Sequence, residues 1–278
     1  MQQTDSIQVI IDAQEPNTRY WKDLWDFREL VYFLSWRDIL VRYKQTTIGL
    51  LWTLIRPLLV MLALTLVFGR IANLASTTTV PYPLLVLAAL LPWQFFANSL
   101  LDGSESLVSN SNLITKIYFP RLLIPISSLI VSLFDFAISF LILVGVMAYY
   151  QFAPSLNMLA LPFFAIQLAC LAFGVSLWIS SLNVKYRDFR YIIPFCIQFG
   201  LYVTPVGFSS NLIPETWRWL YSLNPLVGII DAFRWAILGP GTAFYFQSWI
   251  ESFILTVLIL FSGLAYFRKE ERSFADII

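Results

Sequence analysis

Residues 122–150 of the sequence, LLIPISSLIVSLFDFAISFLILVGVMAYY, decide the fold. This run carries one charged residue, Asp135, and is longer than the roughly 20 apolar residues that a helix needs to cross a bilayer. No further charge appears before Leu182, although the turn-like stretch APSLN interrupts the run at residues 153–157. The sequence therefore predicts two transmembrane helices here, the third and fourth of the chain.

Other apolar runs predict the remaining spans. Residues 57–101 hold a single charge, Arg70, and a turn-like stretch at residues 76–81, which indicates two more helices. Residues 191–214 contain no charge and predict the fifth span. The run from Ser252 to Phe267, extended back to Gln247, predicts the sixth. We therefore expect an all-α integral membrane protein with six transmembrane helices.

Composition supports a membrane protein. Hydrophobic residues make up 58% of the 278 residues and charged residues 13%, against about 25% charged residues in soluble domains. A soluble chain of this length could not bury so much apolar surface in one core. The net charge of +1 gives no indication of a nucleic-acid partner.

The residue types of common catalytic and motor sites are missing. The sequence has no histidine, and Cys170 and Cys196 lie in apolar runs, which argues against a metal site or a disulfide. No glycine is followed by lysine, so the sequence has no Walker loop. The first 16 residues lack the apolar stretch of a signal peptide. We expect a protein that is no enzyme, binds no cofactor itself and takes its energy from a partner.

The basic residues predict the orientation of the chain. If six helices alternate across the membrane, 15 of the 18 lysines and arginines fall on one side. Only Arg70, Arg218 and Arg234 fall on the other. Because cytoplasmic loops are rich in basic residues, both termini are expected in the cytoplasm.

The N-terminal region differs from the spans. After a polar tail at residues 1–17, apolar residues recur at helical spacing within residues 18–51, opposite charged residues and accompanied by three tryptophans. The apolar positions are Leu24, Phe27, Val31 and Leu34, and the tryptophans are Trp21, Trp25 and Trp36. This pattern predicts an amphipathic helix in the cytoplasmic membrane interface. The alternative is an ordinary helix packed under the bundle.

Residues 208–248 also differ from ordinary loops. Asn224-Pro225 and Gly239-Pro240-Gly241 divide this nearly uncharged segment into pieces too short to cross a bilayer. Broken backbone at membrane depth is tolerated where protein or a water-filled cavity surrounds it. We expect short re-entrant helices at the outer face that line or close an exit. The permease domain would then cover residues 52–267, followed by a cytoplasmic tail at residues 268–278.

Asp135 lies near the centre of the third span, where an unpaired charge costs about 2.5–3.5 kcal/mol or more. One interpretation makes it the proton or cation relay of an ion-coupled secondary transporter. The other makes it a buried acid that is hydrogen-bonded to a neighbouring helix. A membrane glycosyltransferase is a third class, but its closest carboxylate pair, Asp102 and Glu105, resembles solvated charges at a membrane face.

Three strings of sequence resemble a known family. LSWRDILVRYK at residues 34–44, followed by IGLLW at residues 48–52 and Arg56-Pro57, is similar to the entrance motif of polysaccharide ABC-exporter permeases. NVKYRD at residues 183–188 resembles their second cytoplasmic loop, which we assign to residues 183–190. Asn224-Pro225-Leu226 with Phe233-Arg234 resembles the segment before their last span.

The resemblance implies a half-transporter in a bacterial inner membrane. Two copies would pair in contact with membrane lipids, and two separate ATPase subunits would bind ATP and dock on the cytoplasmic face. The cargo would be lipid-linked O-antigen, capsular polysaccharide or teichoic acid. Export of drugs or small lipids is an alternative within the same class.

Aromatic and basic residues are candidates for contacts with such a substrate. Phe195, Phe199 and Tyr202 share one face of the fifth span and, with Trp52, are assigned to a sugar tunnel. The alternatives are packing or lipid-facing rings, and an interfacial position for Trp52. Arg42, Lys44 and Arg56 would meet a lipid diphosphate headgroup, or else serve only as positive-inside anchors.

The remaining assignments concern coupling and gating. Residues 103–121 predict a stiff cytoplasmic element, with Ser104 as a helix cap and a break at residues 110–112. The predicted ATPase contacts are Lys116, Tyr118 and Arg121 in this element and Tyr186 and Arg187 in the second loop. The predicted outer gate consists of Asn224, Asp231 and Arg234.

Overall fold

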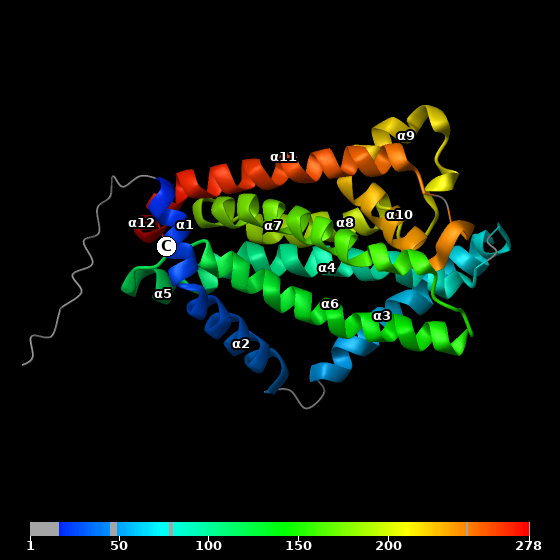
Figure 1. Ribbon diagram of the computed structural model, residues 1–278, viewed down its shortest axis with the longest axis horizontal. Coiled ribbons are helices and arrows are strands. Elements are labelled where there is room, and N and C mark those ends of the chain that lie inside the picture. The colour runs from blue at the N-terminus through cyan, green and yellow to red at the C-terminus, as the bar shows by residue number, and fades with distance from the viewer. Residues whose placement is uncertain (1–16, 45–48, 78–79, 243, 278) are drawn as a thin grey trace, which may run out of the picture.

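The computed structural model describes residues 17–44, 49–77, 80–242 and 244–277, and its regular elements in these ranges are all helical. Most of the predicted N-terminal tail lies outside the described residues. Figure 1 shows long helices side by side, with α1, α5 and α12 at one end and α9 at the other.

The long elements are α2 (Arg28–Lys44), α3 (Gly49–Leu64), α4 (Tyr82–Ser109), α6 (Leu123–Tyr149), α7 (Leu161–Lys185), α8 (Phe189–Val203), α10 (Pro225–Leu238) and α11 (Phe246–Glu270). The short ones are α1 (Asn17–Asp26), η1 (Thr65–Ile71), η2 (Leu74–Thr77), α5 (Ser111–Lys116), η3 (Leu156–Ala160), η4 (Ser210–Leu212), α9 (Glu215–Ser222), η5 (Gly239–Gly241), η6 (Glu271–Ser273) and α12 (Phe274–Ile277).

Five helical segments in the described ranges are long and apolar enough to cross a membrane. They are Leu51–Ile71, Tyr82–Lys116, Leu123–Tyr149, Leu156–Lys185 and Phe246–Ser273. These segments confirm five of the six predicted spans, so the chain is a multi-pass membrane protein.

The fifth predicted span corresponds to a helix that is shorter than the other five. Its helix, α8, has 15 residues and is therefore about 22 Å long, shorter than a hydrocarbon core of about 30 Å. Thr204 leaves the helical conformation with ψ 146° because it precedes Pro205, which disfavours helical backbone at the residue before it. The run at residues 191–214 therefore supplies a helix, but this helix ends at Val203 and is shorter than the five candidate spans.

The centre of the fold is α4, which packs against α6, α7 and α10. Eight consecutive residues in its first half, Leu84 to Leu91, are buried, because neighbouring helices surround this part of α4 on all sides. On the other side of α7, the close crossing with α11 depends on two glycines. A Cβ atom on Gly263 would lie 2.4 Å from the carbonyl oxygen of Gly174.

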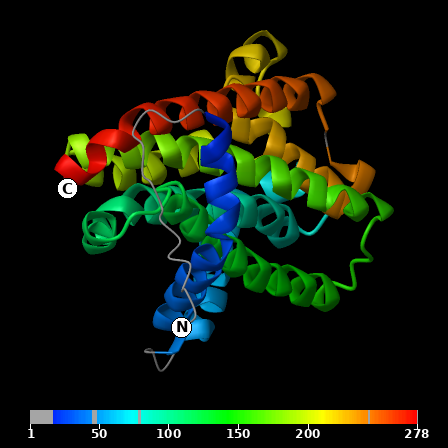
Figure 2. The same cartoon turned by 60° about the vertical axis from the view of Figure 1, so that its left-hand side comes forward.

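The N-terminal region forms two helices rather than one, since the chain turns at Phe27 between α1 and α2. The predicted apolar face packs against the bundle. Leu24, Phe27 and Val31 contact the apolar cluster that contains Leu107 and Phe267, and Leu34 is buried. Trp25 and Trp36 remain exposed on the opposite side. This arrangement matches the alternative of a helix packed against the bundle, while the exposed rings leave an aromatic face free. Figure 2 shows α1 and α2 crossing the neighbouring long helices rather than running parallel to them.

The segment before the last span is broken as expected. The side chain of Asn224 accepts a hydrogen bond from the backbone N–H of Leu226 and caps α10, and Gly239 ends α10 with φ +79°. With 8 and 14 residues, α9 and α10 are too short to cross a membrane. All residues of α10 from Leu226 to Leu238 except Trp235 are buried, so this apolar helix is enclosed by the other helices.

Two local predictions at the other end differ from the structure. Ser104 caps no helix, because α4 continues through it to Ser109 and its hydroxyl donates to the carbonyl of Leu101. The predicted break at residues 110–112 is confirmed at Asn110, after which α5 begins. The second loop is shorter than residues 183–190, since α7 extends to Lys185 and α8 begins at Phe189.

Candidate functional site

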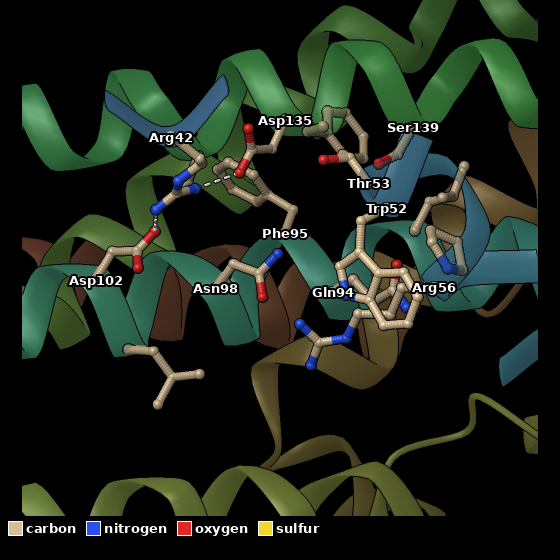
Figure 3. A pocket seen from close by; sticks show the side chains of 15 residues that line it. Arg42, Trp52, Thr53, Arg56, Gln94, Phe95, Asn98, Asp102, Asp135 and Ser139 are labelled. Carbon is tan, nitrogen blue, oxygen red and sulfur yellow. Dashed lines mark hydrogen bonds and ion pairs between the residues drawn. The ribbon is translucent and has the colours of Figure 1, made fainter. Parts of the chain in front are cut away.

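A cavity of about 610 Å³ lies between the end of α2, the start of α3 and the middle parts of α4 and α6 (Figure 3). Its lining combines charged, amide, hydroxyl and aromatic side chains, which is unusual among helices of such apolar composition. The lining residues are Arg42, Trp52, Thr53, Arg56, Pro57, Leu91, Gln94, Phe95, Asn98, Leu101, Asp102, Ser132, Asp135, Phe136 and Ser139.

Helical periodicity accounts for the polar walls of the cavity. On α4, Gln94, Asn98 and Asp102 are spaced four residues apart, so they lie on one face of the helix. On α6, Ser132, Asp135 and Ser139 follow the same rule with spacings of three and four. The two polar stripes line the same cavity and interrupt two otherwise apolar helices.

One arginine connects three helices at the end of the cavity that is formed by α2. Arg42 on α2 donates from Nη2 to Asp102 Oδ2 on α4 at 2.7 Å and from Nη1 to Asp135 Oδ2 on α6 (Figure 3). The neighbouring Tyr43 hydroxyl donates to the other oxygen of Asp135. Burial, and then the hydrogen bond to Asp135, raise the pKa of the Tyr43 phenol to about 12, so it remains a donor at physiological pH. We call the contacts among Asp102, Arg42 and Asp135 the charge bridge.

The charge bridge accounts for the acid in the third span. Asp135 is 7% exposed, and its two hydrogen-bonding partners come from α2, about 90 residues earlier in the sequence. This geometry matches the interpretation of a buried acid bonded to a neighbouring helix.

The predicted headgroup residues are brought together only in part. Arg42 and Arg56 both line the cavity, whereas Lys44 is exposed and does not line it. Arg42 faces two carboxylates, and Arg56 forms no ion pair within the described ranges. Of the two cavity arginines, Arg56 is therefore the one with charge available to attract a ligand.

The predicted tunnel rings lie on the outside of the single chain. On α8, Phe195 is 68% exposed, Phe199 61% and Tyr202 62%, so they form an aromatic face that the other helices leave uncovered. Trp52 is also exposed, but it lies at the cavity on α3. The alternative in which the α8 rings pack against helices of their own chain does not match these exposures.

Most predicted coupling residues are exposed at the end of the bundle that holds α5. Lys116, Tyr118, Tyr186 and Arg187 are exposed. Arg121 instead contacts the C-terminal segment: its guanidinium donates to the backbone carbonyl of Glu271, and its backbone N–H donates to Glu271 Oε1 at 2.7 Å.

Glu271 also ties the N-terminal helix to this cluster. The Tyr20 hydroxyl donates to Glu271 Oε2 at 2.8 Å, and the guanidinium of Arg268 lies 4.4 Å from the centre of the Tyr20 ring. Burial raises the pKa of the Tyr20 phenol, which keeps it protonated as a donor. The cluster joins α1, the segment just before α6, the end of α11 and η6, so these parts are held together next to α5.

The predicted gate residues on α10 are buried within the chain. The Arg234 guanidinium donates to the backbone carbonyls of Leu85, Val206 and Phe208 at 3.2, 3.0 and 2.8 Å. Asp231 accepts from the Ser210 hydroxyl. Together these contacts hold α10 between α4 and the turn that follows α8.

The fold and the cavity are those of a multi-pass membrane protein, and comparison with known proteins places it in a family of transport subunits. The profile of the ABC-2 type transporter family matches residues 29–238, and the chain belongs to this family. Members of the family are permeases that function with an ATPase subunit. This chain is accordingly a transport subunit without an ATPase motif of its own.

The similar proteins are export permeases. The chain is 31% identical to the O-antigen export system permease protein RfbA of Klebsiella pneumoniae over 90% of its own length and 95% of the relative. It is 26% identical to the protein of the same name from Myxococcus xanthus, over 92% and 98% of the two chains. It is 24% identical to the polysialic acid transport protein KpsM of Escherichia coli, over 85% and 92%.

Proposed function

We propose that this chain is the permease half-subunit of an ABC exporter that moves a lipid-linked polysaccharide, of the O-antigen or capsule type, across the bacterial inner membrane. The similarity to O-antigen and polysialic acid permeases along nearly the whole chain carries this proposal. The exposed aromatic face of α8 supports it, because aromatic rings offer sugar rings a broad contact with little specificity.

The proposed topology has six passes, with α8 as a short fifth pass and both termini in the cytoplasm. The distribution of basic residues supports this orientation. So does the clustering of α1, α5 and α12 at one end of the bundle (Figure 1). The re-entrant α9 and α10 would then face the outer side, where α10 acts as part of the exit gate.

A second copy would cover the exposed apolar surfaces of α3 and α8. Leu59 and Leu62 on α3 are exposed, as are the three aromatic residues on α8. In the proposed homodimer these faces meet around the sugar tunnel. Two ATPase subunits would dock on the exposed coupling residues of α5 and of the loop between α7 and α8.

The diphosphate headgroup of the lipid carrier would approach Arg56, assisted by Lys44. Arg42 contributes less than the sequence suggests, because its charge is balanced by Asp102 and Asp135. This assignment places the arrival of the lipid next to the charge bridge.

The test is a pull-down of an affinity-tagged copy from the native host in mild detergent, followed by identification of co-purified proteins and glycolipid. An ATP-binding-cassette ATPase together with a glycan on a lipid diphosphate is the expected result. Purification without an ATPase, together with unchanged surface glycan in a strain that lacks this chain, would reject the proposed function.

A further inference from the structure

The side chains around the cavity can form both donor and acceptor contacts with one small ligand. Gln94 and Asn98 each carry an amide that donates and accepts, and Thr53, Ser132 and Ser139 carry hydroxyls that do the same. Figure 3 shows Asn98 between the charge bridge and the pair Gln94 and Trp52. A polyhydroxylated molecule can use such mixed partners, whereas a lipid tail uses none of them.

Aromatic rings complete this lining. Trp52, Phe95 and Phe136 lie on three different helices and border the same space as the amides and hydroxyls. A pyranose ring has apolar C–H faces and a polar rim of hydroxyls. A cavity that offers rings as well as hydrogen-bonding groups matches both parts of such a ligand.

Among the residues that line the cavity, Ser132 has a buried hydroxyl without a protein partner in the described ranges. Its side chain is 1% exposed, and its hydroxyl has no hydrogen-bond partner in the part of the chain that the structure describes. A buried hydroxyl without a partner costs stability, so nearly all such groups are paired in folded proteins. A hydroxyl of a bound ligand would supply the partner after the Ser132 side chain turns toward the cavity.

The charges around the cavity favour a neutral ligand. The formal charges of Arg42 and Arg56 balance those of Asp102 and Asp135. A diphosphate enclosed in the cavity would need more positive charge than is supplied by Arg56, which is unpaired within the described ranges, and a metal ion would need an excess of carboxylate ligands.

We infer that this cavity is a binding subsite for one neutral sugar residue of the exported glycan, which rests on the proposed function. A volume of about 610 Å³ lies within the range of about 300–1,000 Å³ found for small-molecule sites. The hydroxyls of the sugar contact Asn98 and Ser132, and the charge bridge closes the inner end of the subsite.

The experiment measures sugar binding to the purified protein in lipid nanodiscs by saturation-transfer NMR. The probes are the methyl glycosides of glucose, galactose, mannose and N-acetylglucosamine, with sodium pyrophosphate as the anionic comparison. Ser132→Ala removes the hydroxyl that has no partner, so folding is preserved. Asn98→Leu removes the central amide at similar volume. Gln247→Leu, at an exposed amide on α11, is the control.

Saturation transfer to at least one glycoside is expected, with affinity lowered about 3- to 10-fold in Ser132→Ala and Asn98→Leu and unchanged in the control. No transfer to any glycoside, or equal affinity in the wild-type protein and Ser132→Ala, would overturn the inference. Binding of pyrophosphate alone would assign the cavity to a headgroup instead and overturn it as well. If the glycosides fail while the pull-down still yields ATPase and glycolipid, the subsite is rejected and the proposed function stands.

Discussion

Removing the guanidinium of the charge bridge should destabilise the protein more than removing an exposed arginine. In Arg42→Leu the carboxylate of Asp135 loses its cationic partner while its side chain remains only 10% exposed. Loss of one partner from a fully buried ion pair costs about 3–5 kcal/mol. The Arg42 side chain is 36% exposed, so solvent screens part of this effect. We expect Arg42→Leu to lower the free energy of unfolding by about 1–3 kcal/mol.

The measurement is thermal unfolding in lipid nanodiscs, followed by the loss of the monodisperse peak in size-exclusion chromatography. A loss of 1 kcal/mol lowers the transition by about 2–4 °C in chains of 150–250 residues, so a shift of roughly 2–12 °C is expected. The control is Arg190→Leu, which breaks a 3.3 Å ion pair to Glu105 whose two side chains are 67% and 49% exposed. This control should lower the free energy of unfolding by less than about 1 kcal/mol.

A double-mutant cycle tests the specific pairing. Arg42→Leu combined with Asp135→Leu leaves no uncompensated charge at the third span, so the double variant should be more stable than the sum of the single losses predicts. Strictly additive shifts, or an Arg42→Leu shift no larger than that of Arg190→Leu, would show that the bridge does not form.

Three further predictions concern the proposed export function. Phe199→Ala should slow export of long polymers without lowering thermal stability, because the ring is 61% exposed; a large drop in stability with normal export per molecule would refute the tunnel role. A single cysteine introduced in the loop at residues 154–157 should react with a membrane-impermeant maleimide added outside, and one at Lys185 should not; the reverse pattern would reject the topology. Tyr118→Ala should leave membrane insertion intact but uncouple ATP hydrolysis from export, and crosslinks that place the ATPase away from α5 would contradict this.

The sequence predicts where the helices lie along the chain better than it predicts which side chains pair between them. Long apolar runs located five spans, because a bilayer imposes a minimum length that can be counted. The length of the fifth helix is harder to predict, because the apolar composition continues past Thr204 while the helical conformation of the backbone ends there. Nothing local indicates that Asp135 pairs with Arg42, because the two residues are 93 positions apart and only the fold brings them together.

The polar residues of the cavity follow a helical spacing in the sequence, which a search for long apolar runs does not detect. Gln94, Asn98 and Asp102 repeat every four residues, so they mark one face of α4. Their spacing alone does not identify a site, because each polar residue is isolated in an apolar run, and such residues also occur where a helix forms only one interhelical hydrogen bond. The opposing stripe on α6 distinguishes the two cases, and it becomes visible only when the helices are placed together.

The structure also explains the entrance motif at residues 34–44 in physical terms. Two arginines of α2 contact other helices of the bundle: Arg37 donates to the Asn110 side chain at 3.0 Å, and Arg42 forms the charge bridge. Trp36 and Val41 lie on the exposed face. Arg37 and Arg42 thus attach α2 to α4 and α6, whereas Trp36, Leu40 and Val41 remain exposed. Because Asn110 is the residue at which α4 ends and α5 begins, a displacement of α5 by a docked ATPase would act directly on this attachment of α2.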